Sequence, residues 1–191
     1  MTDIIDKLEN KPKLLLHSCC APCSTYVLER LKEHFDISLY YYNPNIHPQE
    51  EYIIRLEELK DYVKRYDMAV VEEMYDSRVF FEAVKGFENE PEKGKRCYIC
   101  YQLRMEETAQ KAKQLGYDYF GTVLSISPHK NADWINQIGE SLALKYDIHY
   151  LYADFKKENG FKASVAISND NNLYRQDYCG CIFSKNDRKE L

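Results

Sequence analysis

Short apolar runs alternate with amphipathic stretches along most of this chain, and this alternation constrains the possible folds more than any other feature. Runs rich in apolar and β-forming residues predict strands at 13–18, 37–42, 68–71, 119–124 and 149–152. Between these runs, apolar residues recur at helical spacing, which predicts helices at 24–31, 53–63, 96–115 and 131–146. The stretch around 80–91 is less regular, and we expect mostly loop or short helix in the chain beyond 152.

Strands that alternate with helices favour a parallel sheet covered on both faces. We therefore expect an α/β protein with a Rossmann-like three-layer sandwich. The sequence has no internal repeats, linkers or low-complexity stretches, and 191 residues is an ordinary size for one domain. A single domain over 1–191 is the prediction.

Two polar motifs follow strands in this scheme. H-S-C-C-A-P-C at 17–23 follows the first strand, and S-P-H-K at 127–130 follows the fourth. In open parallel sheets, ligands bind beyond the carboxyl ends of the strands. The topology alone thus predicts that both motifs lie at the same functional edge.

The cysteines are the most informative residues for function. They fall in three tight clusters: Cys19, Cys20 and Cys23; Cys97 and Cys100; and Cys179 and Cys181. The count of seven is odd, so disulfides explain it poorly, whereas short spacings from distant parts of one chain are typical of metal ligands. About four thiolates saturate one zinc ion or one [4Fe-4S] cluster, so the set leaves room for a second metal, an open iron or a redox pair. A structural zinc site is the alternative for part of the set.

His129, in the polar turn, is a candidate proton donor or phosphate contact, whereas His17 at a strand end is expected to be packed and hydrogen-bonded. Tyr101 flanks the second cysteine cluster. The net charge is -5, so a polyanionic partner needs a local basic patch. Basic residues that could contact nucleic acid are Lys95, Arg96, Arg104, Lys130, Lys156, Lys157 and Arg175.

The N-terminal sequence M-T-D-I-I-D-K-L-E-N is acidic where a signal peptide would be basic. No apolar stretch approaches the roughly 20 residues of a membrane span. We expect a cytoplasmic protein that does not enter a membrane.

Five motifs taken together, H-S-C-C-A-P-C, R-C-Y-I-C-Y-Q-L-R, T-V-L-S-I-S-P-H-K, D-F-K-K-E-N-G-F and Y-C-G-C, resemble the cobalamin-independent epoxyqueuosine reductase family. The resemblance extends from about residue 13 to 184, and the motifs occur in the same order and at similar separations. It implies a fold related to adenine-nucleotide α-hydrolases. It also implies reduction of an epoxide on the wobble nucleoside of tRNA to give queuosine.

The resemblance further implies a [4Fe-4S] cluster and an additional mononuclear iron in one pocket, held by the cysteines. The place of Cys23 is not always cysteine in the family. Removal of the epoxide oxygen needs two electrons and two protons, and a low-potential donor of the ferredoxin or flavodoxin type would supply the electrons. We assign His129 and Tyr101 as candidate catalytic residues on this basis.

Two other functions stay open. Related proteins activate ATP and thiolate tRNA with the help of iron-sulfur clusters, but their phosphate loop is rich in Gly and Ser. The first turn here, C-C-A-P-C, lacks the glycines that let backbone amides cradle phosphate. The other alternative is a zinc-stapled RNA-binding module without catalysis.

Overall fold

The computed structural model of the chain describes residues 10–187. Residues 1–9 and 188–191 belong to the predicted domain, and the first group carries almost all of the N-terminal segment considered for a signal peptide. They lie outside the described residues, so the extent of the domain stays a prediction.

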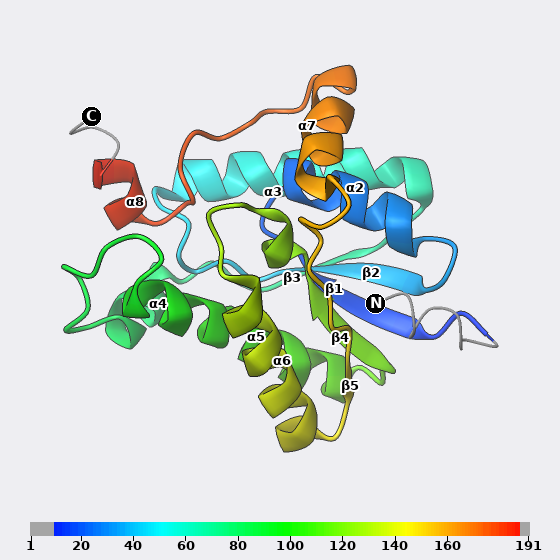
Figure 1. Cartoon of the computed structure of the whole chain (residues 1–191), viewed down its shortest axis with the longest axis horizontal. Coiled ribbons are helices and arrows are strands. Elements are labelled where there is room, and N and C mark those ends of the chain that lie inside the picture. The colour runs from blue at the N-terminus through cyan, green and yellow to red at the C-terminus, as the bar shows by residue number, and fades with distance from the viewer. Residues whose placement is uncertain (1–9, 188–191) are drawn as a thin grey trace.

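A five-stranded parallel sheet forms the centre of the fold (Figure 1). The strand order is β3-β2-β1-β4-β5, with β1 at Lys13–His17, β2 at Asp36–Tyr41, β3 at Val70–Glu72, β4 at Tyr119–Thr122 and β5 at His149–Tyr150. The middle strand is a run of leucines because it has a strand on each side and helices on each face. Its Leu15 is fully buried and pairs with Ser38 of β2 and Phe120 of β4.

Helices cover both faces of this sheet. They are α2 (Ala21–Leu31), α3 (Gln49–Val63), α4 (Ser77–Ala83), α5 (Lys95–Gln114), α6 (Ala132–Tyr146), α7 (Gly160–Asp170) and α8 (Ile182–Asp187), with the 3-10 turns η1 (Lys64–Tyr66) and η2 (Val123–Ile126). Figure 1 shows α2, α3 and α7 on one side of the strands and α5 and α6 on the other. The predicted three-layer α/β sandwich is thus confirmed. None of the helices within residues 10–187 has the length and apolar character needed to cross a membrane.

The element boundaries correct the expectations in three places. The predicted strand at 119–124 ends at Thr122, because its hydroxyl accepts a hydrogen bond from the backbone N–H of Leu124 (3.1 Å) and starts η2. The stretch around 80 contains α4, whose N-cap Asp76 accepts a hydrogen bond from the backbone N–H of Arg78 (3.0 Å). The region beyond 152, expected to be mostly loop or short helix, contains the 11-residue helix α7 as well as the 6-residue helix α8.

The strand order has its switch point between β1 and β4, since the chain runs outward from β1 to β3 and then returns to β4 beside β1. A crevice forms at such a point beyond the carboxyl ends of the two strands. The segment after β1 carries the first cysteine cluster, and the segment after β4 carries the 127–130 turn. Both predicted motifs therefore lie at the edge where a ligand is expected.

Candidate metal and substrate site

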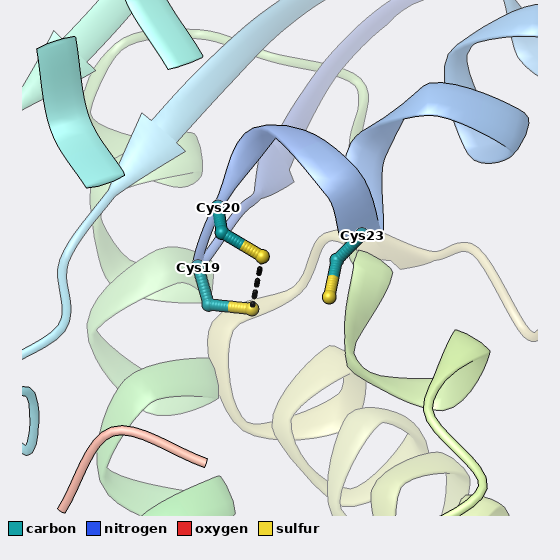
Figure 2. Close-up of side chains that lie close together, drawn as sticks. All are labelled: Cys19, Cys20 and Cys23. Carbon is teal, nitrogen blue, oxygen red and sulfur yellow. Dashed lines mark hydrogen bonds between the residues drawn. The ribbon is translucent and has the colours of Figure 1, made fainter. Parts of the chain in front are cut away.

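The first cysteine cluster lies where β1 passes into α2. Cys20 is the N-cap of α2 in an extended conformation, and Pro22 follows in the first turn. The Sγ atoms of Cys19, Cys20 and Cys23 all lie within 4.8 Å of one another, and Figure 2 shows the three side chains converging. Within residues 10–187, this is the one group of three or more Cys, His, Asp or Glu gathered so closely. Such a group is compact enough for its members to share one metal ion.

These three thiols hold their protons unequally. Hydrogen bonds from Cys20 and Cys23 hold the pKa of Cys19 well below its ordinary value. The hydrogen bond with Cys19 raises the pKa of Cys20 to about 12, and hydrogen bonds with Cys19 and Cys20 raise that of Cys23. Cys19 is therefore the thiol that ionises first, and a metal must displace protons from the other two.

The other four cysteines line the smaller of two cavities at the cysteine clusters. Cys97 and Cys100 come from the first two turns of α5, and Cys179 and Cys181 from the segment before α8. All four line a cavity of about 20 Å³. Burial raises the pKa of Cys100 to about 11 and that of Cys181 to about 12. All seven cysteines are free thiols, as expected for ligands.

A larger cavity of about 230 Å³ opens beside the first cluster. Cys19 and Cys23 lie on one side of it, the turn with His129 and Lys130 on another, and Cys179 on a third. Cys179 thus lines both cavities. The structure brings all three cysteine clusters to one region at the carboxyl edge of the sheet, as the sequence predicted.

Two buried cations face the thiols. Arg104, on α5, is 1% exposed, and Lys130 is 9% exposed. In the described part of the chain neither forms a salt bridge with a carboxylate, and the Nη2 atom of Arg104 is buried without a hydrogen-bond partner. An unpaired buried charge is unfavourable, so both cations need nearby negative charge.

The cysteines supply that charge when they ionise. Burial alone would lower the pKa of Lys130, but negative charge on Cys179, Cys19 and Cys23 raises it above its ordinary value. Burial likewise opposes the charge of Arg104, and ionised Cys100 and Cys179 raise its pKa. A set of thiolates bound to metal therefore fits the residues present better than seven neutral thiols.

Arg55 is a functional candidate that the sequence analysis missed. It lies on α3, is fully buried, and donates from Nε to Glu51 (2.7 Å). Its two Nη atoms donate to the carbonyls of Cys179 (3.2 Å) and Tyr178 (3.3 Å). It thereby fixes the backbone that carries the C-x-C cluster. A helical arginine in a stretch of alternating charges resembles a surface residue, so its burial could not be predicted from the sequence.

The histidines and Tyr101 are placed as follows. His17 is buried and hydrogen-bonded to Thr122 Oγ1 (3.0 Å) and to the carbonyl of Tyr42 (3.2 Å), as expected for a packed residue. Burial, then the charge of Arg104, lowers the pKa of His17 to about 3. His129 is exposed at the rim of the larger cavity, and Tyr101 is buried at the smaller one. The catalytic roles assigned to His129 and Tyr101 stay predictions.

The predicted nucleic-acid contacts divide into two groups. Lys95, Lys157 and Arg175 are exposed, and Arg175 lines the larger cavity. Lys156 is half-buried, and its Nζ donates to the carbonyls of Ser125 and Lys130, both at 3.2 Å.

Arg96 and Arg104 differ from the expectation, because contact with a phosphate backbone needs an exposed guanidinium and both are buried. Arg96 donates to the carbonyls of Glu88 and Glu90 and packs 4.5 Å from the ring centre of Phe183. Lys130 also faces the thiols rather than open solvent. All three line the cavities that the cysteines also line.

Solved structures with the same fold include two tRNA-modification proteins. A U34-tRNA thiolase, NcsA from Methanococcus maripaludis, solved with its [4Fe-4S] cluster, superimposes with a TM-score of 0.59 at 11% identity, covering 94% of this chain and 63% of that one. A predicted subunit of tRNA methyltransferase from Methanocaldococcus jannaschii gives the same TM-score and identity and covers 88% and 94%. These likenesses show that the chain shares its α/β fold with both proteins.

Sequence comparison is more specific. The family profile described as "Epoxyqueuosine reductase QueH" matches residues 14–187. Relatives with that name are 43% identical over 182 residues in Staphylococcus epidermidis (91% of this chain, 76% of the relative) and 44% identical over 181 residues in Acinetobacter baylyi (94% and 83%). The relative in Thermotoga maritima is 34% identical over 180 residues (93% and 92%). The family suggested by the five motifs is thus confirmed, and this chain belongs to the epoxyqueuosine reductase QueH family.

Proposed function

We propose that this protein reduces the epoxide of epoxyqueuosine at the wobble position of tRNA to give queuosine. The observation that carries the proposal is the convergence of three cysteine clusters around two adjoining cavities in a chain of this family. Its partners are tRNA bearing the epoxide and a low-potential electron donor of the ferredoxin or flavodoxin type. The reaction takes place in the cytoplasm, where tRNA is modified.

The cysteines are the proposed ligands of a [4Fe-4S] cluster and an additional iron. The four around the smaller cavity, Cys97, Cys100, Cys179 and Cys181, equal the ligand number of one cluster. The close trio after β1 offers a compact site for the additional iron. Together the two centres supply electrons one at a time and a Lewis acid for the C–O bond.

The protein side chains bind the substrate and manage charge and protons. Epoxide plus two electrons and two protons gives alkene and water, so negative charge develops on the departing oxygen. Lys130 lines the larger cavity and has no carboxylate partner among residues 10–187, and its ammonium is proposed to stabilise that charge. His129 at the rim is the proposed proton donor, with Tyr101 as the buried alternative.

The larger cavity is the proposed site for the modified base. An anticodon loop presents unpaired bases, so the enzyme can take one without opening a duplex. Arg175 at the rim is exposed and can meet the phosphate backbone, as can Lys157 outside it. These local contacts fit an acidic protein that lacks global attraction to RNA.

The direct test incubates anaerobically reconstituted protein with epoxide-bearing tRNA and a low-potential reductant, followed by digestion and identification of the nucleoside. We expect queuosine to replace epoxyqueuosine, and Cys19→Ala, which removes the first thiol to ionise, to abolish the conversion. An unchanged epoxide in protein whose iron sites are full would refute the proposal. ATP-dependent gain of sulfur by the tRNA would favour the thiolase alternative, and a colourless zinc protein the structural one.

His129→Ala tests the proton donor. We expect this variant to keep the iron content of the wild type, because His129 is exposed and is not a proposed ligand, and to lose most turnover. Full activity of His129→Ala together with loss in Tyr101→Phe would move the role to Tyr101.

A further inference from the structure

An open apolar pocket lies beside the cysteine site, on the side of α5 that faces α6. Its lining residues are Phe87, Lys95, Tyr98, Ile99 and Trp134, and its volume is about 390 Å³. None of these residues lines the two cavities described above. We call it the Trp134 pocket.

Helix capping and a ring–ring contact fix Trp134 and Tyr98, two of the aromatic residues that line the Trp134 pocket. Trp134 is in the first turn of α6, whose N-cap Asn131 accepts hydrogen bonds from the backbone N–H groups of Asp133 (3.0 Å) and Trp134 (3.1 Å). Its ring meets that of Tyr98 edge to face, with centroids 5.5 Å apart and planes at 83°. Both side chains are half-buried, so part of each stays open to solvent. The pocket is preformed and needs little ordering to accept a ligand.

The elements that form the Trp134 pocket also form the cysteine site. Tyr98 directly follows Cys97 on α5, and α6 starts immediately after the turn that places His129 and Lys130 at the larger cavity. A ligand that enters the larger cavity therefore has its neighbouring groups near the starts of these two helices. For RNA, those groups are the adjacent nucleotides.

The chemistry of the lining selects among possible ligands. Aromatic rings stack on unpaired bases of any sequence, and an exposed cation such as Lys95 can meet one phosphate. Exposed carboxylates of Glu88 and Asp133 flank the lining residues in the chain and disfavour a longer contact with the phosphate backbone. The same carboxylates disfavour docking of an acidic electron-transfer protein. A base held mainly by stacking fits the pocket best.

Resting on the proposed function, we propose that the Trp134 pocket receives an unpaired base of the tRNA anticodon loop next to the modified nucleotide. The stacked base fixes the loop on the protein while the modified base occupies the larger cavity. Binding by stacking also gives an acidic protein affinity that does not depend on net charge.

Trp134 is the single tryptophan of the chain, so its fluorescence reports on this pocket alone. The iron-loaded wild-type protein is titrated with an RNA hairpin that carries the anticodon loop. We expect saturable quenching, and we expect the quenching to be lost when one particular loop nucleotide beside the wobble position is made abasic. Quenching that persists with every abasic loop, or no change of fluorescence on binding, would overturn the proposal.

Variants test the energetic contribution. Trp134→Leu is expected to raise the Kd for the hairpin, and the KM for epoxide-bearing tRNA, about tenfold or more, with kcat at saturating tRNA unchanged. The ratio of the Kd of Trp134→Leu to the Kd of the wild type stays the same at low and high salt, because stacking releases few counterions. Trp134→Phe keeps a ring and recovers most of the affinity. Tyr152→Leu, which removes an aromatic residue that is 44% exposed outside this pocket, serves as the matched control and binds as the wild type does.

Circular dichroism and iron content show whether the variants fold, and Tyr98→Leu supplies a second change of the same pocket. Wild-type affinity in both folded variants overturns the proposal. If the fluorescence responds to a reduced flavodoxin and not to RNA, the pocket is a protein-docking site and the proposal is also wrong. If the wild type binds no tRNA and reduces no epoxide, the proposed function itself fails, which distinguishes the two outcomes.

Discussion

Arg55 connects α3 to the backbone of the C-x-C cluster, and its removal should damage stability and metal binding separately. The guanidinium is fully buried between Glu51 and the carbonyls of Tyr178 and Cys179. Arg55→Met retains much of the packing volume and deletes the charge. The perturbation is therefore mainly electrostatic.

The expected loss of stability follows from Glu51, the partner that Arg55→Met leaves unpaired. Glu51 is only 8% exposed, so Arg55→Met leaves a nearly buried carboxylate without its cation. Breaking one side of a buried ion pair costs about 3–5 kcal/mol. With a urea m-value of about 2 kcal/mol/M for a protein of this size, the midpoint of unfolding should fall by about 2 M.

A double variant separates the two effects of Arg55. In Glu51→Met/Arg55→Met no unpaired charge remains, and replacement of a buried ion pair by apolar residues is often nearly neutral. We expect most of the lost stability to return. The carbonyls of residues 178 and 179 nevertheless stay without their donor, so iron content after reconstitution should remain below that of the wild type.

The assay is urea unfolding of metal-free protein under anaerobic, reducing conditions, with iron analysis after reconstitution. Lys60→Met is the matched control, because Lys60 lies on the same helix in exposed ion pairs and should change stability by about 0.5 kcal/mol or less. An Arg55→Met variant within about 1 kcal/mol of the wild type would refute the ion-pair reasoning. A double variant with full iron content would refute the idea that Arg55 must hold the backbone of the C-x-C cluster in place for iron to bind.

The remaining predictions concern the ligands and their surroundings. Cys19→Ala should bind less iron than Cys23→Ala, measured by metal analysis, because Cys19 is the thiol that ionises most readily; equal loss would contradict this ranking. Lys130→Met should lower turnover about 100-fold while iron content changes little, and unchanged turnover would exclude its proposed role. Removal of iron by a chelator should lower the melting temperature, since a metal bound only to the native state stabilises it; identical melting with and without iron would show that the metal does not hold the site together. Gly180→Ala should lower iron content, because φ is +130° there and an added Cβ would lie 3.0 Å from Ile46 Cγ1; a normal iron content would show that the turn adapts.

The regular parts of the fold were predictable because their burial is periodic. The leucines of β1 and the apolar face of α6 carry the pattern that each element needs. The helix α7 escaped prediction because the residues it buries are Gly160, Ser164 and Ser168. Small polar residues allow close packing against α2 but leave no hydrophobic stripe to recognise.

The parts of the site that depend on residue spacing and strand topology could be predicted from the sequence. The parts that depend on tertiary contacts could not. Cysteine spacing and strand topology place the three clusters at one edge, as the structure has them. The burial of Arg96 and Arg104 could not be predicted from the sequence. Arginines on a helix are usually exposed to solvent, but these two lie on the buried face of α5. Arg104 lies near the thiols of Cys100 and Cys179, whereas Arg96 donates to the backbone carbonyls of Glu88 and Glu90.

The order of the cysteines along the chain has a consequence for how the protein matures. The segment that bears Cys179 and Cys181 is synthesised after the other cysteines, and it must then reach Arg55, more than a hundred residues earlier, before the smaller cavity exists. If iron binds there as proposed, it can do so only after this segment has been made. Until then the earlier thiols stand without their final partners, and oxidation of these thiols in that period would lower the share of the protein that can bind the proposed metal.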